Sequence, residues 1–115
     1  MTQECKSVKI NEIEISNNLP FTVFGGMNVL EDEVTCMEIA KILKETCSKL
    51  ALSFVFKASF DKANRSSVGS YRGPGLSKGL EILSQIKQEL NIPIITDVHE
   101  PDQARQAAEV VDVLQ

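Results

Sequence analysis

The segment KASFDKANRSS, residues 57–67, places two lysines, an arginine, an asparagine and three serines directly after an apolar run. Arg65 and Ser66 join a planar guanidinium to a hydroxyl, a combination that suits phosphate oxygens. The spacing from Lys57 to Lys62 and on to Arg65 does not fit one face of a helix, because helical neighbours lie three or four residues apart. The pattern therefore favours a loop wrapped around an anion.

The charge distribution also indicates a small anionic ligand. The chain has a net charge of −4, which argues against nucleic-acid binding by the whole surface. Within residues 57–78, however, five basic residues face one acid, so this window carries +4 and the rest of the chain carries −8. The window contains Lys57, Lys62, Arg65, Arg72 and Lys78, with Asp61 as the acid. Neither a GxxxxGK[ST] phosphate loop nor a dinucleotide glycine fingerprint is present.

A second polar group lies in TDVHE, residues 96–100. Asp97 and the only histidine, His99, are two residues apart at the expected end of a strand, so we expect their side chains to point the same way. Acid–base catalysis and metal binding are the functional interpretations, and a hydrogen-bonded structural histidine is the alternative. Asn28, which follows Gly25-Gly26, is expected either to cap a helix or to contact a ligand.

The elements that would position these groups alternate along the chain. Residues 8–15 have a short alternating pattern interrupted by Asn11-Glu12, which predicts an N-terminal hairpin. The three cysteines lack zinc or disulfide spacing, and we expect Cys36 and Cys47 to pack in the core from one helix face. The predicted strands cover 21–24, 51–56, 92–98 and 110–115, and the predicted helices cover 31–49, 76–90 and a short segment from Pro101.

This order predicts an α/β fold with parallel strands. Two architectures fit, an open doubly wound sheet and half of a (β/α)8 barrel, and in both the ligand site lies at the carboxyl ends of the strands. The connection 57–75 is much longer than the usual two to six residues or so, which favours a functional loop. Because a barrel needs about 250 residues, we expect a single truncated domain.

Four segments carry a family resemblance. FGGMNVLE, FKASFDKANRSS, SYRGPG and IITDVHEP followed by VVDVLQ resemble the N-terminal part of the 3-deoxy-D-manno-octulosonate 8-phosphate synthases, also called 2-dehydro-3-deoxyphosphooctonate aldolases. The resemblance runs from about residue 20 to 115, after a hairpin within residues 1–18. It implies a (β/α)8 TIM barrel, usually a homotetramer, that condenses phosphoenolpyruvate with arabinose 5-phosphate and releases phosphate. The family acts in the cytoplasmic route to lipopolysaccharide.

The resemblance also implies roles for individual residues. Lys57 would lie near the reacting centre, and Lys62 would hold the phosphoenolpyruvate anion. Asn64 would meet sugar hydroxyls, while Arg65 and Ser66 would hold the arabinose phosphate. The catalytic candidates are thus Lys57, Lys62, Asp97 and His99, and the substrate-binding candidates are Asn28, Lys57, Lys62, Asn64, Arg65, Ser66 and Gln115.

Asn28 also bears on the metal class. Metal-dependent members of the family carry a cysteine ligand at this position, so asparagine implies the metal-independent branch and no cofactor. The later strands of the family supply further phosphate-binding groups, so we expect the 115-residue chain alone to be inactive. No apolar window approaches the roughly 20 residues of a membrane helix, and no basic leader begins the chain, so we expect a cytoplasmic protein.

Three other functions remain open from the sequence. Heptulosonate synthases also use phosphoenolpyruvate, with erythrose 4-phosphate, but carry a Lys-Pro-Arg-Thr-Ser pattern where this chain has Lys-Ala-Asn-Arg-Ser-Ser. A Schiff-base aldolase would use Lys57 as its nucleophile, with the pKa of the amine lowered by burial or nearby cations. A non-catalytic half-barrel would need a partner to cover its apolar faces.

Overall fold

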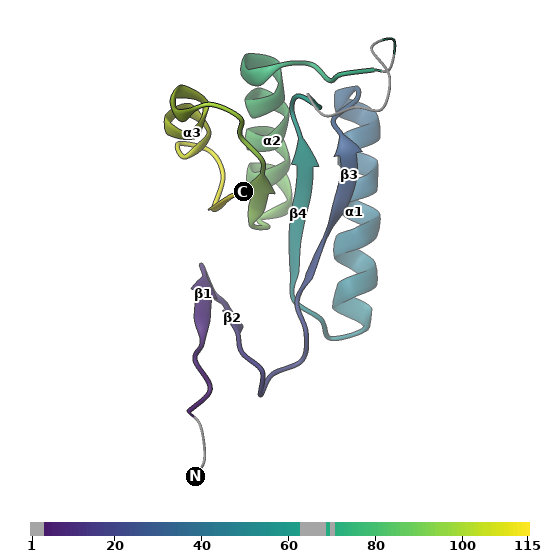
Figure 1. Ribbon diagram of the computed structural model, residues 1–115. Coiled ribbons are helices and arrows are strands. Elements are labelled where there is room, and N and C mark those ends of the chain that lie inside the picture. Colours follow the sequence, from purple (N-terminus) through teal and green to yellow (C-terminus); the bar gives the residue numbers. More distant parts are fainter. Residues whose placement is uncertain (1–3, 63–68, 70) are drawn as a thin grey trace.

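The computed structural model describes residues 4–62, 69 and 71–115 (Figure 1). Within these residues, an antiparallel hairpin precedes a parallel sheet of four strands and three helices. The elements are β1 Val8–Ile10, β2 Ile13–Ile15, β3 Val23–Val29, α1 Glu33–Lys49, β4 Phe54–Ser59, α2 Leu76–Leu90, β5 Ile94–Thr96, α3 Pro101–Ala107 and β6 Val113–Leu114. The predicted α/β class, hairpin and parallel strands are therefore confirmed. Among the described helices, none is long and apolar enough to cross a membrane.

The predicted bounds of all four strands of the parallel sheet differ from the observed ones. β3 does not end at Gly25 but continues through both glycines to Val29, because this strand pairs with β4 along its whole length. β4 begins at Phe54, three residues later than expected, because residues 50–52 form the capping turn of α1. The N–H groups of Leu50 and Leu52 both donate to the carbonyl of Cys47. β5 and β6 are also shorter than the apolar runs that predicted them.

All three helices pack on one face of the sheet. The sheet contributes Phe54, Phe56, Ala58 and Ile94 to this core, which is the alternate set of residues along β4. The helices contribute Cys36, Ala40 and Cys47 from α1, Ile82, Leu83, Ile86 and Leu90 from α2, and Ala107 from α3. The expected burial of Cys36 and Cys47 is confirmed. A doubly wound sheet would carry helices on both faces, so this layering differs from that alternative.

The opposite face of the sheet, which we call the open face, is covered differently at its two ends. At the amino end, Ile10 of the hairpin packs with Val55 and Ile95, and Ile13, Ile15 and Val113 surround them. Figure 1 shows the hairpin at this lower end of the sheet, away from the helices. No helix among the described residues packs on the open face. The hairpin thus fills the apolar part of this face and leaves its carboxyl end to polar residues.

Asp112 connects the hairpin to the sheet and to α2. Its Oδ1 accepts hydrogen bonds from the side-chain amide of Asn11 at 2.8 Å and from Nζ of Lys87 at 2.9 Å, and its Oδ2 accepts from the Ile94 N–H at 2.9 Å. Burial opposes ionisation of this carboxyl, but the hydrogen bonds from Asn11, Ile94 and Lys87 outweigh it and lower its pKa. The ionised carboxylate therefore stabilises this junction.

We expect Asp112→Asn to destabilise the protein in a pH-dependent way. Because the folded-state pKa lies below the unfolded value, the contribution of Asp112 is present above the unfolded pKa and is lost as the pH falls through the folded pKa. The variant should lose about 1–3 kcal/mol of unfolding free energy near neutral pH. In urea titrations this difference should shrink towards about pH 3. A constant difference at every pH would contradict the account, and Asp102→Asn, in an exposed pair with Arg105, is the matched control.

Candidate active site

The candidate residues gather at the carboxyl end of the open face. The strand register aligns Gly26, Lys57, Ile95 and Val113 in one row across the sheet. Two residues further along the chain, Ser59 and Asp97 form the next row and join β4 to the segment after β5. Side chains two residues apart in a strand point to the same face, so this row lies directly above Lys57.

The sequence had suggested that Lys57 lies at the end of the strand. In the structure it lies inside β4. It is half-buried and alternates with Phe56 and Ala58, which pack under the helices, so its side chain stands on the open face. The fully buried Val55 lies two residues before it on the same face. A cation held in the middle of a paired strand is more rigidly positioned than one on a loop, which suits a group that must meet a reacting atom.

Ser59 is a site residue that the sequence reasoning missed. Its hydroxyl donates to Oδ1 of Asp97 at 2.5 Å, and the serine itself is only 3% exposed. The sequence offered one signal for Ser59: it lies two residues after Lys57, and side chains two residues apart in a strand point to the same face. The hydrogen bond ties the Asp97 carboxylate, just after β5, to the end of β4, two residues beyond Lys57.

Asp97 and His99 lie near each other but are not hydrogen-bonded. Nε2 of His99 is 3.8 Å from Oδ2 of Asp97, and it lies 2.9 Å from the backbone carbonyl of Asp61. A carbonyl only accepts, so Nε2 must carry the hydrogen in this arrangement, which leaves Nδ1 as the imidazole's acceptor. Both residues follow the end of β5 at Thr96, so the expected strand position was wrong, and the loop brings them together.

The other candidates occupy the rim of this region. Asn28 is exposed in β3, at the irregularity between Met27 and Val29. The helix-cap alternative for Asn28 is wrong, because Asp32 caps α1: its Oδ1 accepts the Thr35 N–H at 2.9 Å, and this bond lowers the pKa of Asp32. Gln115 is exposed, and its N–H donates to the Thr96 carbonyl at 3.0 Å.

The two ends of the long connection after β4 lie side by side. Lys62 is half-buried, and its N–H donates to the carbonyl of Arg72 at 2.7 Å. The guanidinium of Arg72 pairs with Asp61, and this hydrogen bond raises the pKa of Arg72. Tyr71, the residue before Arg72, is 57% exposed. The candidates Asn64, Arg65 and Ser66 lie outside the described residues.

The candidate residues that the structure describes lie on an open polar face. A cavity of about 410 Å³ lies at the opposite, amino end of the sheet, where Asn11, Lys44 and Phe54 are among its lining residues. None of the candidate residues that the structure describes lines that cavity. The chemistry is therefore concentrated where parallel α/β folds place their ligands, at the carboxyl ends of the strands.

Comparisons with known proteins agree with this picture. Residues 3–115 match the model of the DAHP synthetase I family. The chain is 60% identical over 108 residues to a protein of Pseudoalteromonas translucida, covering 94% of this chain and 38% of the relative. It is 56% identical over 109 residues to one of Marinobacter nauticus, covering 95% of this chain and 39% of the relative. Both relatives are named 2-dehydro-3-deoxyphosphooctonate aldolase.

These names confirm the resemblance found in the sequence. A relative from a Shewanella species carries the same name and is 56% identical over 110 residues, covering 96% of this chain and 39% of its own length. The chain thus spans about two fifths of the length of the curated relatives that it matches. With the family model matching from residue 3 to residue 115, the chain belongs to the DAHP synthetase I family.

Proposed function

We propose that the protein carrying this chain condenses phosphoenolpyruvate with D-arabinose 5-phosphate. The products are 3-deoxy-D-manno-octulosonate 8-phosphate and inorganic phosphate, in the cytoplasmic synthesis of lipopolysaccharide. The observation that carries the proposal is the placement of Lys57 on the open face, next to the hydrogen-bonded pair of Ser59 and Asp97. The names of relatives at 56–60% identity support the same reaction.

We further propose that this chain provides the first four strands of a (β/α)8 barrel, and that the whole protein forms a homotetramer. The sequential strand order and the helices on a single face both support a barrel, because its helices form only an outer ring. The remaining strands would bring their own inward-facing residues opposite Lys57 and Asp97. The 115-residue chain without them is proposed to be inactive.

The residues of the open face suit the charge changes of this reaction. A carbon–carbon bond forms between the methylene carbon of phosphoenolpyruvate and the aldehyde carbon, water supplies an oxygen atom, and phosphate leaves. Negative charge develops on the aldehyde oxygen, and the ammonium of Lys57 would stabilise it in a preorganised position. Lys62 would bind the phosphoenolpyruvate anion. Asn28 and Gln115 would line the site with Asp97 and His99, while Asn64, Arg65 and Ser66 would hold the sugar phosphate.

The test is phosphate release from phosphoenolpyruvate by the complete protein, in which this chain is joined to the remaining strands of the barrel. With arabinose 5-phosphate we expect a kcat/KM at least about 100-fold higher than with erythrose 4-phosphate, because the site must discriminate sugars of different length and hydroxyl content. No release with either aldehyde would overturn the proposal. Borohydride trapping of an adduct on Lys57 would favour the Schiff-base aldolase instead.

Heptulosonate phosphate synthesis is the second candidate function. The description of the matched family, DAHP synthetase I, favours it. The sequence Lys-Ala-Asn-Arg-Ser-Ser and the names of the relatives favour the octulosonate synthase. A preference for erythrose 4-phosphate in the same assay would establish the second function.

We propose that the reaction needs no metal ion. The support is Asn28 in β3. Metal-dependent members of the octulosonate 8-phosphate synthase family, which this chain resembles, carry a cysteine ligand at this position. Neutral amide oxygens suit zinc poorly, whereas cysteine thiolates bind it strongly. We expect dialysis against a chelator to leave kcat unchanged. Loss of activity on chelation, with recovery on adding a divalent ion, would contradict the proposal.

A further inference from the structure

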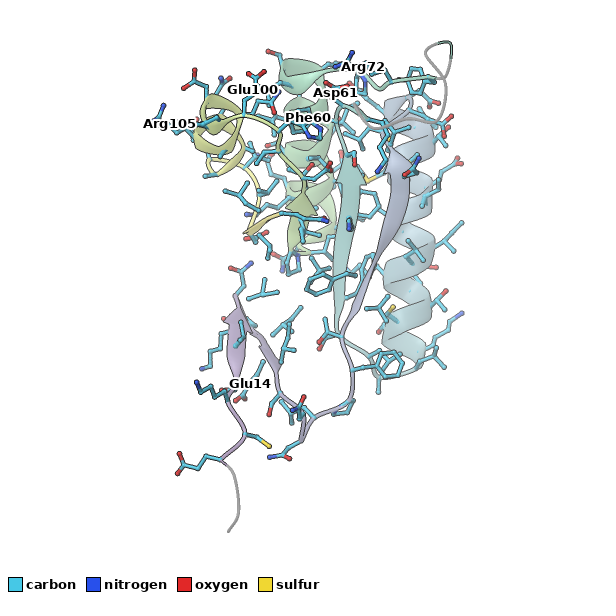
Figure 2. The ribbon with its side chains drawn as sticks, viewed as in Figure 1. Glu14, Phe60, Asp61, Arg72, Glu100 and Arg105 are labelled. Carbon is cyan, nitrogen blue, oxygen red and sulfur yellow. The ribbon has the colours of Figure 1, made fainter. Side chains whose placement is uncertain are left out.

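Asp61 and Arg72 form a two-point contact at the base of the long connection after β4. Nε of Arg72 donates to Oδ1 of Asp61 at 2.5 Å, and Nη2 donates to Oδ2 at 3.1 Å. Figure 2 shows the two side chains together above the end of β4, well away from Arg105 on α3. Most exposed ion pairs contribute little, but a guanidinium that donates to both carboxylate oxygens has a defined geometry.

Backbone contacts hold the same two chain segments side by side. The Lys62 N–H donates to the carbonyl of Arg72, and the Gly75 N–H donates to the carbonyl of Phe60 at 3.0 Å. Gly73 has a φ of +115°, and a Cβ atom there would lie 2.5 Å from the carbonyl oxygen of Phe60. A side chain at this position would therefore force the segments apart. The glycine allows Arg72 to approach the end of β4.

Asp61 also contacts the loop after β5. Its backbone carbonyl accepts from Nε2 of His99 at 2.9 Å, while its carboxylate binds Arg72. His99 in turn lies 3.8 Å from the carboxylate of Asp97, which Ser59 holds. Asp61 thus links the segment of Arg72 to the segment of His99, and Lys62 is its immediate neighbour in the chain.

We propose that Asp61 and Arg72 are positioning residues that set the location of Lys62 relative to the open face. The inference rests on the proposed function, because Lys62 is there the group that binds the phosphoenolpyruvate anion. Arg72 contributes through its contact with Asp61 and its carbonyl bond to the Lys62 N–H, and it does not itself bind the anion. A displaced Lys62 would weaken phosphoenolpyruvate binding more than it would slow the chemical step.

Replacing Asp61 distinguishes this role from direct anion binding by Arg72. If Arg72 bound the anion, Asp61→Asn would release its guanidinium from a competing carboxylate, and the KM for phosphoenolpyruvate would stay the same or fall. In the positioning role, Asp61→Asn and Arg72→Gln each raise this KM by about tenfold or more, with a smaller change in kcat. The double variant should be no worse than Asp61→Asn alone, because Asp61→Asn has already removed the contact that Arg72→Gln removes. Arg72→Lys keeps the positive charge but loses the two-point contact of the guanidinium. Its KM for phosphoenolpyruvate should therefore lie between those of the unmodified protein and of Arg72→Gln.

The matched control is Arg105→Gln, which breaks the exposed pair between Arg105 and Asp102 on α3. This variant should leave the KM unchanged. Hydrogen exchange gives a readout that needs no activity: the Lys62 amide should exchange faster in Arg72→Gln, while the amides of α2 should not. An unchanged KM and unchanged Lys62 exchange would overturn the inference, as would a lower KM in Asp61→Asn. If the unmodified protein does not consume phosphoenolpyruvate, the proposed function fails, and the exchange measurement still decides on the contact.

Discussion

Lys57→Met is expected to lower kcat by about 100- to 1,000-fold, the usual cost of removing one preorganised group that stabilises developing charge. Lys57 is the only charged residue in β3, β4, β5 and β6, so no neighbouring strand residue of the described sheet can replace it. Methionine preserves the length and apolar contacts of the lysine stem but carries no charge. The measurement is steady-state phosphate release with both substrates saturating.

The fold should tolerate this substitution well. Lys57 is half-buried, and replacing a partly buried cation by methionine removes a desolvation cost. Lys9→Met provides the control, because Lys9 is an exposed lysine in β1 and its replacement should leave kcat unchanged. A Lys57→Met protein with native stability and a kcat within about threefold of the unmodified protein would be inconsistent with any role in charge stabilisation.

Gly26→Ala is expected to destabilise the sheet by about 1–3 kcal/mol or more, as overpacking does in close-packed interiors. A Cβ atom at residue 26 would clash with the carbonyl oxygen of Lys57 and would lie 2.9 Å from its carbonyl carbon. Both atoms belong to the backbone of the paired strand, so they cannot rotate away. β3 would have to separate from β4 at the row that contains Lys57.

This substitution should therefore lower both the stability and the activity. Thermal unfolding and phosphate release should fall together, because the displaced backbone carries Lys57. Gly25→Ala is the matched control: a Cβ atom there would meet only side-chain atoms, at 3.4 Å and 3.8 Å. It should change the unfolding free energy by about 0.5 kcal/mol or less. Equal effects of the two substitutions would contradict the close approach of β3 to β4.

The sequence predicted the helices better than the strands. The bounds of α2 were predicted correctly, because Leu80, Leu83 and Leu90 repeat at helical spacing between Gly75 and Asn91. Asn91 ends the helix in the left-handed conformation, with φ of 51°. The bounds of β3 were missed because two consecutive glycines usually indicate a turn, whereas Gly26 is required here by the close approach of Lys57. Periodicity carries no information about such contacts between strands.

The sequence selected the candidate residues by type, but it did not predict their contacts. Lys57, Asp97 and His99 were selected by residue type and by their place near strand ends, and the parallel sheet does bring them to one edge. The bond between Ser59 and Asp97 joins residues 38 positions apart and depends on the register of β4 with β5. The pairing of Asp61 with Arg72 depends on the path of the chain between them. Neither follows from spacing in a single sequence.

The most direct test of the account is the product formed when the protein receives phosphoenolpyruvate with equal concentrations of arabinose 5-phosphate and erythrose 4-phosphate. Mass spectrometry distinguishes the eight-carbon from the seven-carbon sugar acid phosphate, so one sample reports the choice between the two family activities. The account predicts the eight-carbon product almost alone. A predominantly seven-carbon product, or unchanged phosphoenolpyruvate in the presence of both aldehydes, would contradict it.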